Sequence, residues 1–164
     1  MVLCTFRLGD LYLGVDIRLI QEIKRAVNWT PVPGAAPHVR GLLNNRGRVT
    51  TLIDLKRRLN WIPEASTSIK GNKKEYEVIL KTRHQVSQID ESLAREKVFW
   101  DDSAALMVDQ LGEVVEVIGQ QMQSPPANLG EISSDLVEAV VEQEKALLII
   151  LNVARIIGAK DEES

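Results

Sequence analysis

Short stretches that alternate apolar and polar residues recur along the chain, and glycine, proline and aspartate turn signals separate them. Val2–Leu8 alternates in this way, and Gly9-Asp10 is a turn signal before the next such stretch, so the chain is predicted to open with a β-hairpin. A period of two is typical of half-buried strands. Strands are predicted over residues 2–8, 11–17, 22–27, 49–54, 76–82, 104–109, 114–118, 136–142 and 146–152.

The predicted helical segments are short. Asp16 can cap a helical turn over residues 18–20, and residues 21–27 fit either a continuation of that helix or a third strand. The strand is favoured from Glu22 onward, because Pro31 would cut a helix short. Further helical turns are expected over residues 55–59 and 153–157.

The segment from Val32 to Leu59 concentrates turn signals. Pro31 and Pro33 fix φ and withhold backbone donors, so the chain must turn there. A strand, a tight turn that carries Arg46 and Gly47, and a return strand are predicted to follow.

Two segments lack a strand pattern. Residues 60–74 are rich in Pro, Gly, Ser and Lys and are predicted to link two lobes. Residues 83–103 are too charged for a core strand, but Ile89, Leu93 and Trp100 lie near helical spacing. We therefore expect an amphipathic helical or partly ordered arm there, and a frayed acidic tail over 158–164.

A weak internal repeat indicates two related lobes. Val15-Asp16 precedes Leu52-Ile53-Asp54-Leu55 in the first half, and Val108-Asp109 precedes Ile150-Leu151-Asn152-Val153 in the second. In both halves an arginine and then an apolar residue follow the four-residue motif. Short strands with glycine-rich turns close best as small barrels, because closure removes exposed edges.

The composition excludes several classes of function. A chain of 164 residues with 45% hydrophobic content can form one compact domain or two small lobes that share an interface. The net charge is −3 and the basic residues are scattered, so neither nucleic acid nor an anionic membrane is an expected partner. No run reaches the ~18 apolar residues of a membrane span, and no leader pattern opens the chain. We expect a soluble, cytoplasmic protein.

Candidate catalytic and metal-binding residues are scarce. A metal site needs three or four convergent ligands, and the chain has few histidine or cysteine candidates: His38, His84 and the single Cys4. Cys4 lies mid-strand on a predicted buried face, which is unsuited to a nucleophile. Gly41 and Gly47 lack the adjacent lysine and hydroxyl of a phosphate loop. No catalytic residue, metal or cofactor is therefore expected.

Arg46 has two interpretations at this point: a solvated turn residue, or the partner of Glu22 if the first lobe closes on itself. An exposed ion pair adds little to stability, so a functional dependence on this pair would indicate recognition. Arginines at partly desolvated interfaces often contribute strongly to binding.

These residues also carry a resemblance to a known family. The sequence resembles the CheW family of chemotaxis coupling proteins over nearly its whole length. Two matching motifs lie in the first half, Gly-Leu-Leu-Asn-Asn-Arg-Gly at 41–47 and Leu-Ile-Asp-Leu at 52–55, and a Glu-Ile pair precedes them at 22–23. In the second half the matches are a Val-Asp stretch at 108–114 and the closing strand at 147–152.

The resemblance implies a mainly β fold of two SH3-like, five-stranded β-barrel subdomains with short helices. The chain would then be one CheW-like domain over 1–164. Its first subdomain would cover about 15–75 plus swapped terminal elements, and its second about 76–152, with residues 83–103 as an arm longer than the usual loop.

The resemblance also implies a non-catalytic scaffold that couples chemoreceptors to the regulatory domain of a CheA-type histidine kinase in a two-component signalling array. The scaffold would be recruited to membrane-associated arrays. A receptor-binding groove is implied at Ile20, Glu22, Asn44, Arg46, Leu111 and Val114, whereas the kinase contact is implied only on strand edges of the first lobe. Asn45 replaces a family leucine, so its amide should face solvent or meet a polar partner.

Two other functions stay open from the sequence. A CheW-like adaptor could serve a non-chemotactic array that controls pili or gliding motility. In another class, a small double-barrel ligand-binding protein or enzyme would need a closed apolar pocket with convergent polar groups.

Overall fold

The computed structural model describes residues 1–61, 74–127, 129–144 and 146–158. Most of the predicted linker, residues 62–73, and most of the predicted acidic tail, residues 159–164, lie outside the described residues. The strands are β1 Val2–Leu8, β2 Leu11–Asp16, β3 Ile20–Arg25, β4 Val39–Asn45, β5 Arg48–Asp54, β6 Tyr76–Leu80, β7 Ala104–Val108, β8 Gln110–Glu116, β9 Met122–Gln123, β10 Val137–Glu142 and β11 Leu147–Leu151. The α-helices are α1 Leu55–Arg58, α2 Arg83–Ser87, α3 Glu91–Lys97 and α4 Val153–Ile157, and short 3₁₀ turns cover Ile17–Leu19, Gly119–Gln121 and Ser134–Leu136.

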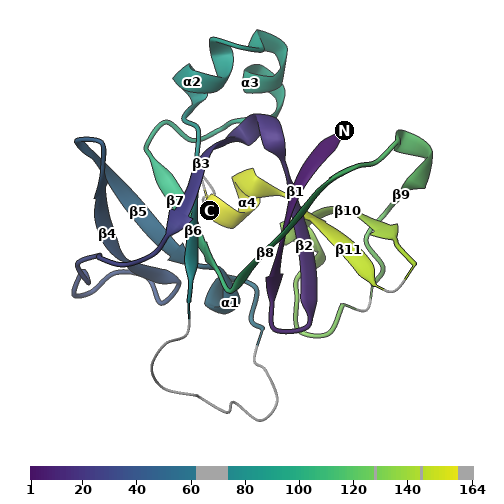
Figure 1. The fold of residues 1–164 in the computed structure, drawn as a ribbon, viewed down its shortest axis with the longest axis horizontal. Coiled ribbons are helices and arrows are strands. Elements are labelled where there is room, and N and C mark those ends of the chain that lie inside the picture. Colours follow the sequence, from purple (N-terminus) through teal and green to yellow (C-terminus); the bar gives the residue numbers. More distant parts are fainter. Residues whose placement is uncertain (62–73, 128, 145, 159–164) are drawn as a thin grey trace.

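The strands form two sheets, and the prediction of a mainly β fold with two barrels is confirmed (Figure 1). One sheet has the order β3-β6-β7-β5-β4. The other has the order β8-β1-β2-β11-β10-β9 and therefore six strands, because it includes the two-residue β9 that the sequence pattern did not predict.

The strand pairing divides the chain differently from the expected boundary near residue 76. β6 pairs with β3 and β7, so strands before and after that boundary share the five-stranded sheet. The chain leaves the six-stranded sheet after Asp16 and returns to it at Gln110. All strands between these points belong to the five-stranded sheet.

The repeat found in the sequence is present, but its two halves exchange strands. β5, which carries Leu52–Asp54, pairs in parallel with β7 from the second half. β11, which carries the matching second motif, pairs in parallel with β2 from the first half. Asp54 and Asn152 occupy equivalent places and cap α1 and α4 by accepting from the N–H of Arg57 and Arg155. Each barrel is thus built from both halves of the chain.

Three groups of buried side chains hold the fold together. One fills the five-stranded barrel and includes Leu52, Ile79 and Met107. A second lies in the six-stranded sheet around Leu148 and Ile150. The third and largest lies between the sheets, and we call it the shared core. Its members include residues from both sheets and from the arm: Phe6, Leu13, Val78, Leu106, Val86, Leu93, Val98, Trp100 and Ile149.

The arm at 83–103 is helical, as predicted, and it also supplies buried side chains. Thr82 caps α2 in a capping box with Gln85. Leu93 and Trp100 are buried in the shared core, and the indole N–H of Trp100 donates to the carbonyl of Lys81 at 2.8 Å. Ile89, predicted on the apolar face with them, is instead 58% exposed, because it lies in the turn between α2 and α3 and belongs to neither helix.

Candidate functional site

The five-stranded sheet closes along the line between β3 and β4, its two outer strands, and we call this line the seam. At one end, Thr30 and Leu42 exchange two backbone hydrogen bonds of 2.8 and 2.9 Å. At the other end the contacts are made by side chains. Lys24 donates to Asn45 at 3.0 Å, and Arg46 donates to Glu22 at 2.9 Å. The ion pair predicted between Glu22 and Arg46 is therefore present.

A two-residue turn presents Arg46 to solvent. Asn45 pairs with Arg48, and both intervening residues have positive φ, 56° for Arg46 and 81° for Gly47. This is the geometry of a type I′ hairpin turn, whose twist matches that of the flanking strands. The side-chain oxygen of Asn44 accepts the N–H of Gly47 at 2.8 Å and braces the turn. The Arg46 side chain, 74% exposed, is thus held at a fixed place on the surface.

The charges at this end of the seam affect each other. The hydrogen bond from Arg46 lowers the pKa of the Glu22 carboxyl, and partial burial opposes this shift. The same bond raises the pKa of Arg46. Both groups are therefore charged at neutral pH, and the pair displays an ordered guanidinium toward solvent.

Asn45 meets a polar partner, as the sequence predicted, rather than solvent. It is only 3% exposed, and its oxygen accepts the ammonium of Lys24. Lys24 in turn lies 3.9 Å from the buried carboxylate of Glu77 on β6. No local pattern of residues indicates that Lys24 and Glu77 belong to this site, since only the cross-strand pairing of β3 with β6 places them together.

Leu111 and Val114 lie on β8, an outer strand of the other sheet. Two residues of β8, Gly112 and Glu113, oppose Thr5 of β1, which makes a β-bulge. Because the bulge adds one residue, Leu111 and Val114 project from the same face of the strand even though they are three positions apart. Both are exposed, opposite the buried Phe6 and Cys4 of the shared core.

The predicted receptor-binding residues therefore fall into three places. Glu22, Asn44 and Arg46 are joined around the seam. Leu111 and Val114 line the exposed margin beside the shared core. Ile20 is buried in the shared core at the start of β3, so its side chain anchors that strand.

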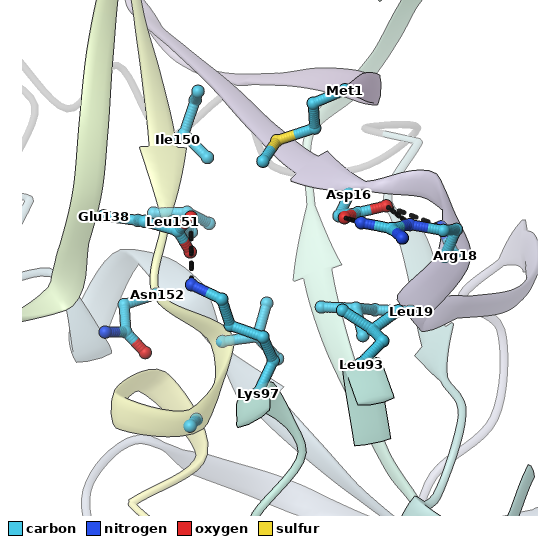
Figure 2. A pocket seen from close by; sticks show the side chains of 12 residues that line it. Met1, Asp16, Arg18, Leu19, Leu93, Lys97, Glu138, Ile150, Leu151 and Asn152 are labelled. Carbon is cyan, nitrogen blue, oxygen red and sulfur yellow. Dashed lines mark hydrogen bonds and ion pairs between the residues drawn. The ribbon is translucent and has the colours of Figure 1, made fainter. Parts of the chain in front are cut away.

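Cavities give little support to a small-molecule site. Figure 2 shows one cavity between α3, β10, β11 and the end of β2, with Lys97 directed toward Glu138 and Arg18 toward Asp16. These ion pairs measure 3.3 Å for Lys97–Glu138 and 2.7 Å for Arg18–Asp16. The volume of this cavity is about 60 Å³, whereas ligand pockets occupy roughly 300–1,000 Å³. A larger cavity of about 370 Å³ near His38 and Phe99 is open to solvent. Neither is a closed apolar pocket with convergent polar groups.

Within the described part of the chain, no three His, Cys, Asp or Glu side chains are grouped so that they could hold a metal ion. No helix in the described ranges has the length and apolar character needed to cross a bilayer.

Comparison with known proteins gives one consistent result. The chain is 26% identical over 159 residues to chemotaxis protein CheW of Treponema pallidum, covering 97% of the chain and 83% of that protein. It is 25% identical over 160 residues to CheW of Bacillus subtilis, covering 98% and 88%. A shorter stretch of 55 residues, 34% of each chain, is 40% identical to protein FrzA of Myxococcus xanthus.

The fold comparison agrees. The crystal structure of the scaffolding protein TtCheW from Thermoanaerobacter tengcongensis superposes with a TM-score of 0.70 at 23% identity, over 92% of the present chain and 82% of that one. The family model described as a CheW-like domain matches residues 3–161. The chain therefore belongs to the CheW-like domain family.

Proposed function

We propose that this chain is a non-catalytic adaptor that couples chemoreceptors to a CheA-type histidine kinase. The observation that carries the proposal is the ordered, exposed guanidinium of Arg46, held by Glu22 on a tight turn. An arginine fixed in this way is suited to a protein partner, because little side-chain freedom remains to be lost on binding.

The receptor-facing surface would combine the seam with the margin of the shared core. Arg46, Glu22 and Asn44 would supply polar contacts, and Leu111 and Val114 exposed apolar ones. Such a mixture suits a helical receptor tip, which offers both apolar and charged side chains. The kinase would contact strand edges of the first lobe.

An adaptor of this kind acts by geometry. If it binds receptor and kinase together, a shift in the receptor changes the populations of kinase states, and the effect is reciprocal. The protein itself would reside in the cytoplasm and join membrane-associated arrays through these partners.

The test is receptor control of kinase activity in a reconstituted mixture of this protein, a CheA-type kinase and receptor cytoplasmic fragments. Arg46→Glu replaces the ion pair with two facing carboxylates. We expect it to weaken receptor-fragment binding by about tenfold or more, the scale of an interface arginine, and to abolish receptor control of autophosphorylation.

The matched control is Arg95→Glu, which makes the same charge change at an equally exposed arginine on α3. It should leave both readouts unchanged. A folded Arg46→Glu variant that still couples receptor to kinase would remove the seam from the receptor-facing surface.

The same adaptor chemistry would serve an array that controls pili or gliding instead of swimming. Pull-down with the purified chain, followed by identification of the bound kinase and receptor, distinguishes these outputs.

A further inference from the structure

Five polar side chains lie in a row across the seam. Beginning inside the barrel, the Glu77 carboxylate lies 3.9 Å from the Lys24 ammonium, which donates to Asn45 at 3.0 Å. At the outer end, Glu22 accepts from Arg46 at 2.9 Å. Lys24 and Glu22 are neighbours on one face of β3, and Asn45 immediately precedes Arg46. The Lys24–Asn45 pair therefore lies beside the Glu22–Arg46 pair.

The inner end of this row is deeply buried. The Glu77 side chain is 4% exposed, and one of its carboxylate oxygens has no hydrogen-bond partner. Burying a carboxylate with one cationic neighbour and an unpaired oxygen costs stability, and apolar residues at such places often serve stability better. A contribution to fold stability therefore does not explain why these polar residues are present.

The amide of Asn45 can link the two pairs because it has both a donor and an acceptor. The lysine ammonium can only donate, so the atom of Asn45 that faces it must be the oxygen. Asn45 also contributes to the lowered pKa of the Glu22 carboxyl, of which Arg46 is the largest cause. A leucine at this position could neither accept from Lys24 nor act on Glu22 in this way.

Arg46 uses Nε and Nη2 on Glu22. Within the ranges that the structure describes, no hydrogen bond engages its Nη1, which leaves one arm of the guanidinium for a partner's carboxylate or carbonyl oxygen.

We propose that Asn45, oriented by Lys24 and the buried Glu77, is a positioning residue for the Glu22–Arg46 pair. Through that pair it fixes the direction in which Arg46 meets an acceptor on the receptor. The proposal rests on the proposed function for its partner, but the positioning itself is a property of this chain alone.

The first test needs no partner. In Asn45→Leu, NMR titration should show the pKa of Glu22 raised, and exchange of the Arg46 Nε proton should be faster by about fivefold, the scale of one net hydrogen bond. Lys24→Met removes a partly exposed ammonium whose charge itself lowers the pKa of Glu22. For this variant the deciding readout is therefore the exchange of the Arg46 Nε proton, which should again be faster. This keeps the test available if the leucine variant does not fold.

The matched control is Thr50→Val. Thr50 is a buried polar residue of the same barrel, bonded to Ser103 at 2.8 Å and away from the seam. It should lower stability without moving the Glu22 titration or the Arg46 exchange. If Asn45→Leu and Lys24→Met fold and leave both readouts as in the unmodified protein, the positioning role is overturned.

The second test uses a receptor cytoplasmic fragment as the probe. Asn45→Leu should weaken its binding about fivefold, and should have no further effect in an Arg46→Ala background, because its action passes through Arg46. An equal loss in both backgrounds would overturn the link to Arg46. If the unmodified chain binds no receptor fragment while the NMR changes occur, the receptor function fails and the positioning role stands.

Discussion

At the scale of single residues, the seam contains two carboxylates with opposite environments. Burial raises the pKa of Glu77, with Lys24 opposing and Glu22 adding to the shift. For Glu22, the hydrogen bond from Arg46 lowers the pKa. The two groups should therefore contribute to stability in opposite directions as pH changes.

This gives a paired prediction for Glu77→Gln and Glu22→Gln. A raised folded-state pKa means stability that is present below the unfolded pKa and lost as pH rises through the folded pKa. The stability advantage of the unmodified protein over Glu77→Gln should therefore shrink as pH rises from acid to neutral. For Glu22→Gln it should shrink as pH falls. Urea unfolding at several pH values measures both, and two slopes of the same sign would contradict the prediction.

Gly41 on β4 is a second residue with a measurable consequence. A Cβ added there would lie 2.5 Å from the carbonyl oxygen of Thr30 and 2.9 Å from the Trp29 ring. Gly41→Ala should thus force β4 from the Thr30 bridge and destabilise the protein by roughly 1–3 kcal/mol. Denaturant unfolding tests this. Gly119→Ala, where an added Cβ meets nothing within 4 Å, should be nearly neutral.

The residue pattern predicted the Glu22–Arg46 pair and the need for a polar partner at Asn45. It did not predict Lys24 or Glu77, because their proximity depends on the register of β3 against β6. A lysine or a glutamate in a predicted strand is also typical of its solvated face. The residue types alone therefore do not indicate that Lys24 and Glu77 belong to a site. The bulge that aligns Leu111 with Val114 was likewise invisible without the β1–β8 register.

At the scale of elements, the arm distinguishes what local pattern can and cannot predict. Helical spacing predicted its helices, but the division between buried and exposed apolar residues depends on how α2 and α3 pack on the sheets. Ion pairs tie the arm to two places, Asp90 to Arg18 at 3.3 Å and Lys97 to Glu138 at 3.3 Å. The arm is therefore part of the framework between the barrels.

Two substitutions on the arm test this. Leu93→Ala removes a shared-core side chain and should lower the free energy of unfolding by about 2–5 kcal/mol. Ile89→Ala removes an equally large but exposed side chain and should change stability by less than about 0.5 kcal/mol. Equal effects in thermal or urea unfolding would mean that the arm does not pack as described.

Hairpins were predictable because their strands are neighbours in sequence. The parallel pairs β2–β11 and β5–β7 were not, since parallel strands need long connections and no local pattern names the partner. The residues therefore indicate the repeat, whereas an exchange of terminal elements was expected only from the family resemblance.

At the scale of the whole molecule, the chain crosses between the sheets at Asp109, which is braced from both sides. Its carboxylate accepts the N–H of Gly9 at 3.1 Å and lies 3.0 Å from the Lys56 ammonium. Gly9 belongs to the β1–β2 turn and Lys56 to α1 of the five-stranded side. This contact and the shared core give the two barrels a fixed relation, which an adaptor needs if it transmits geometry.

The exchange of strands also sets an order of events during synthesis. Leu13 of β2 pairs with Ile149 of β11. β2 can therefore pair with β11 only after most of the chain has been synthesised, and synthesis of that length takes on the order of ten seconds. The strands of the five-stranded barrel all lie between residues 20 and 108 and can assemble earlier. The nascent protein would therefore expose the edge of β2 until β11 emerges, and this is the interval in which a chaperone would matter most.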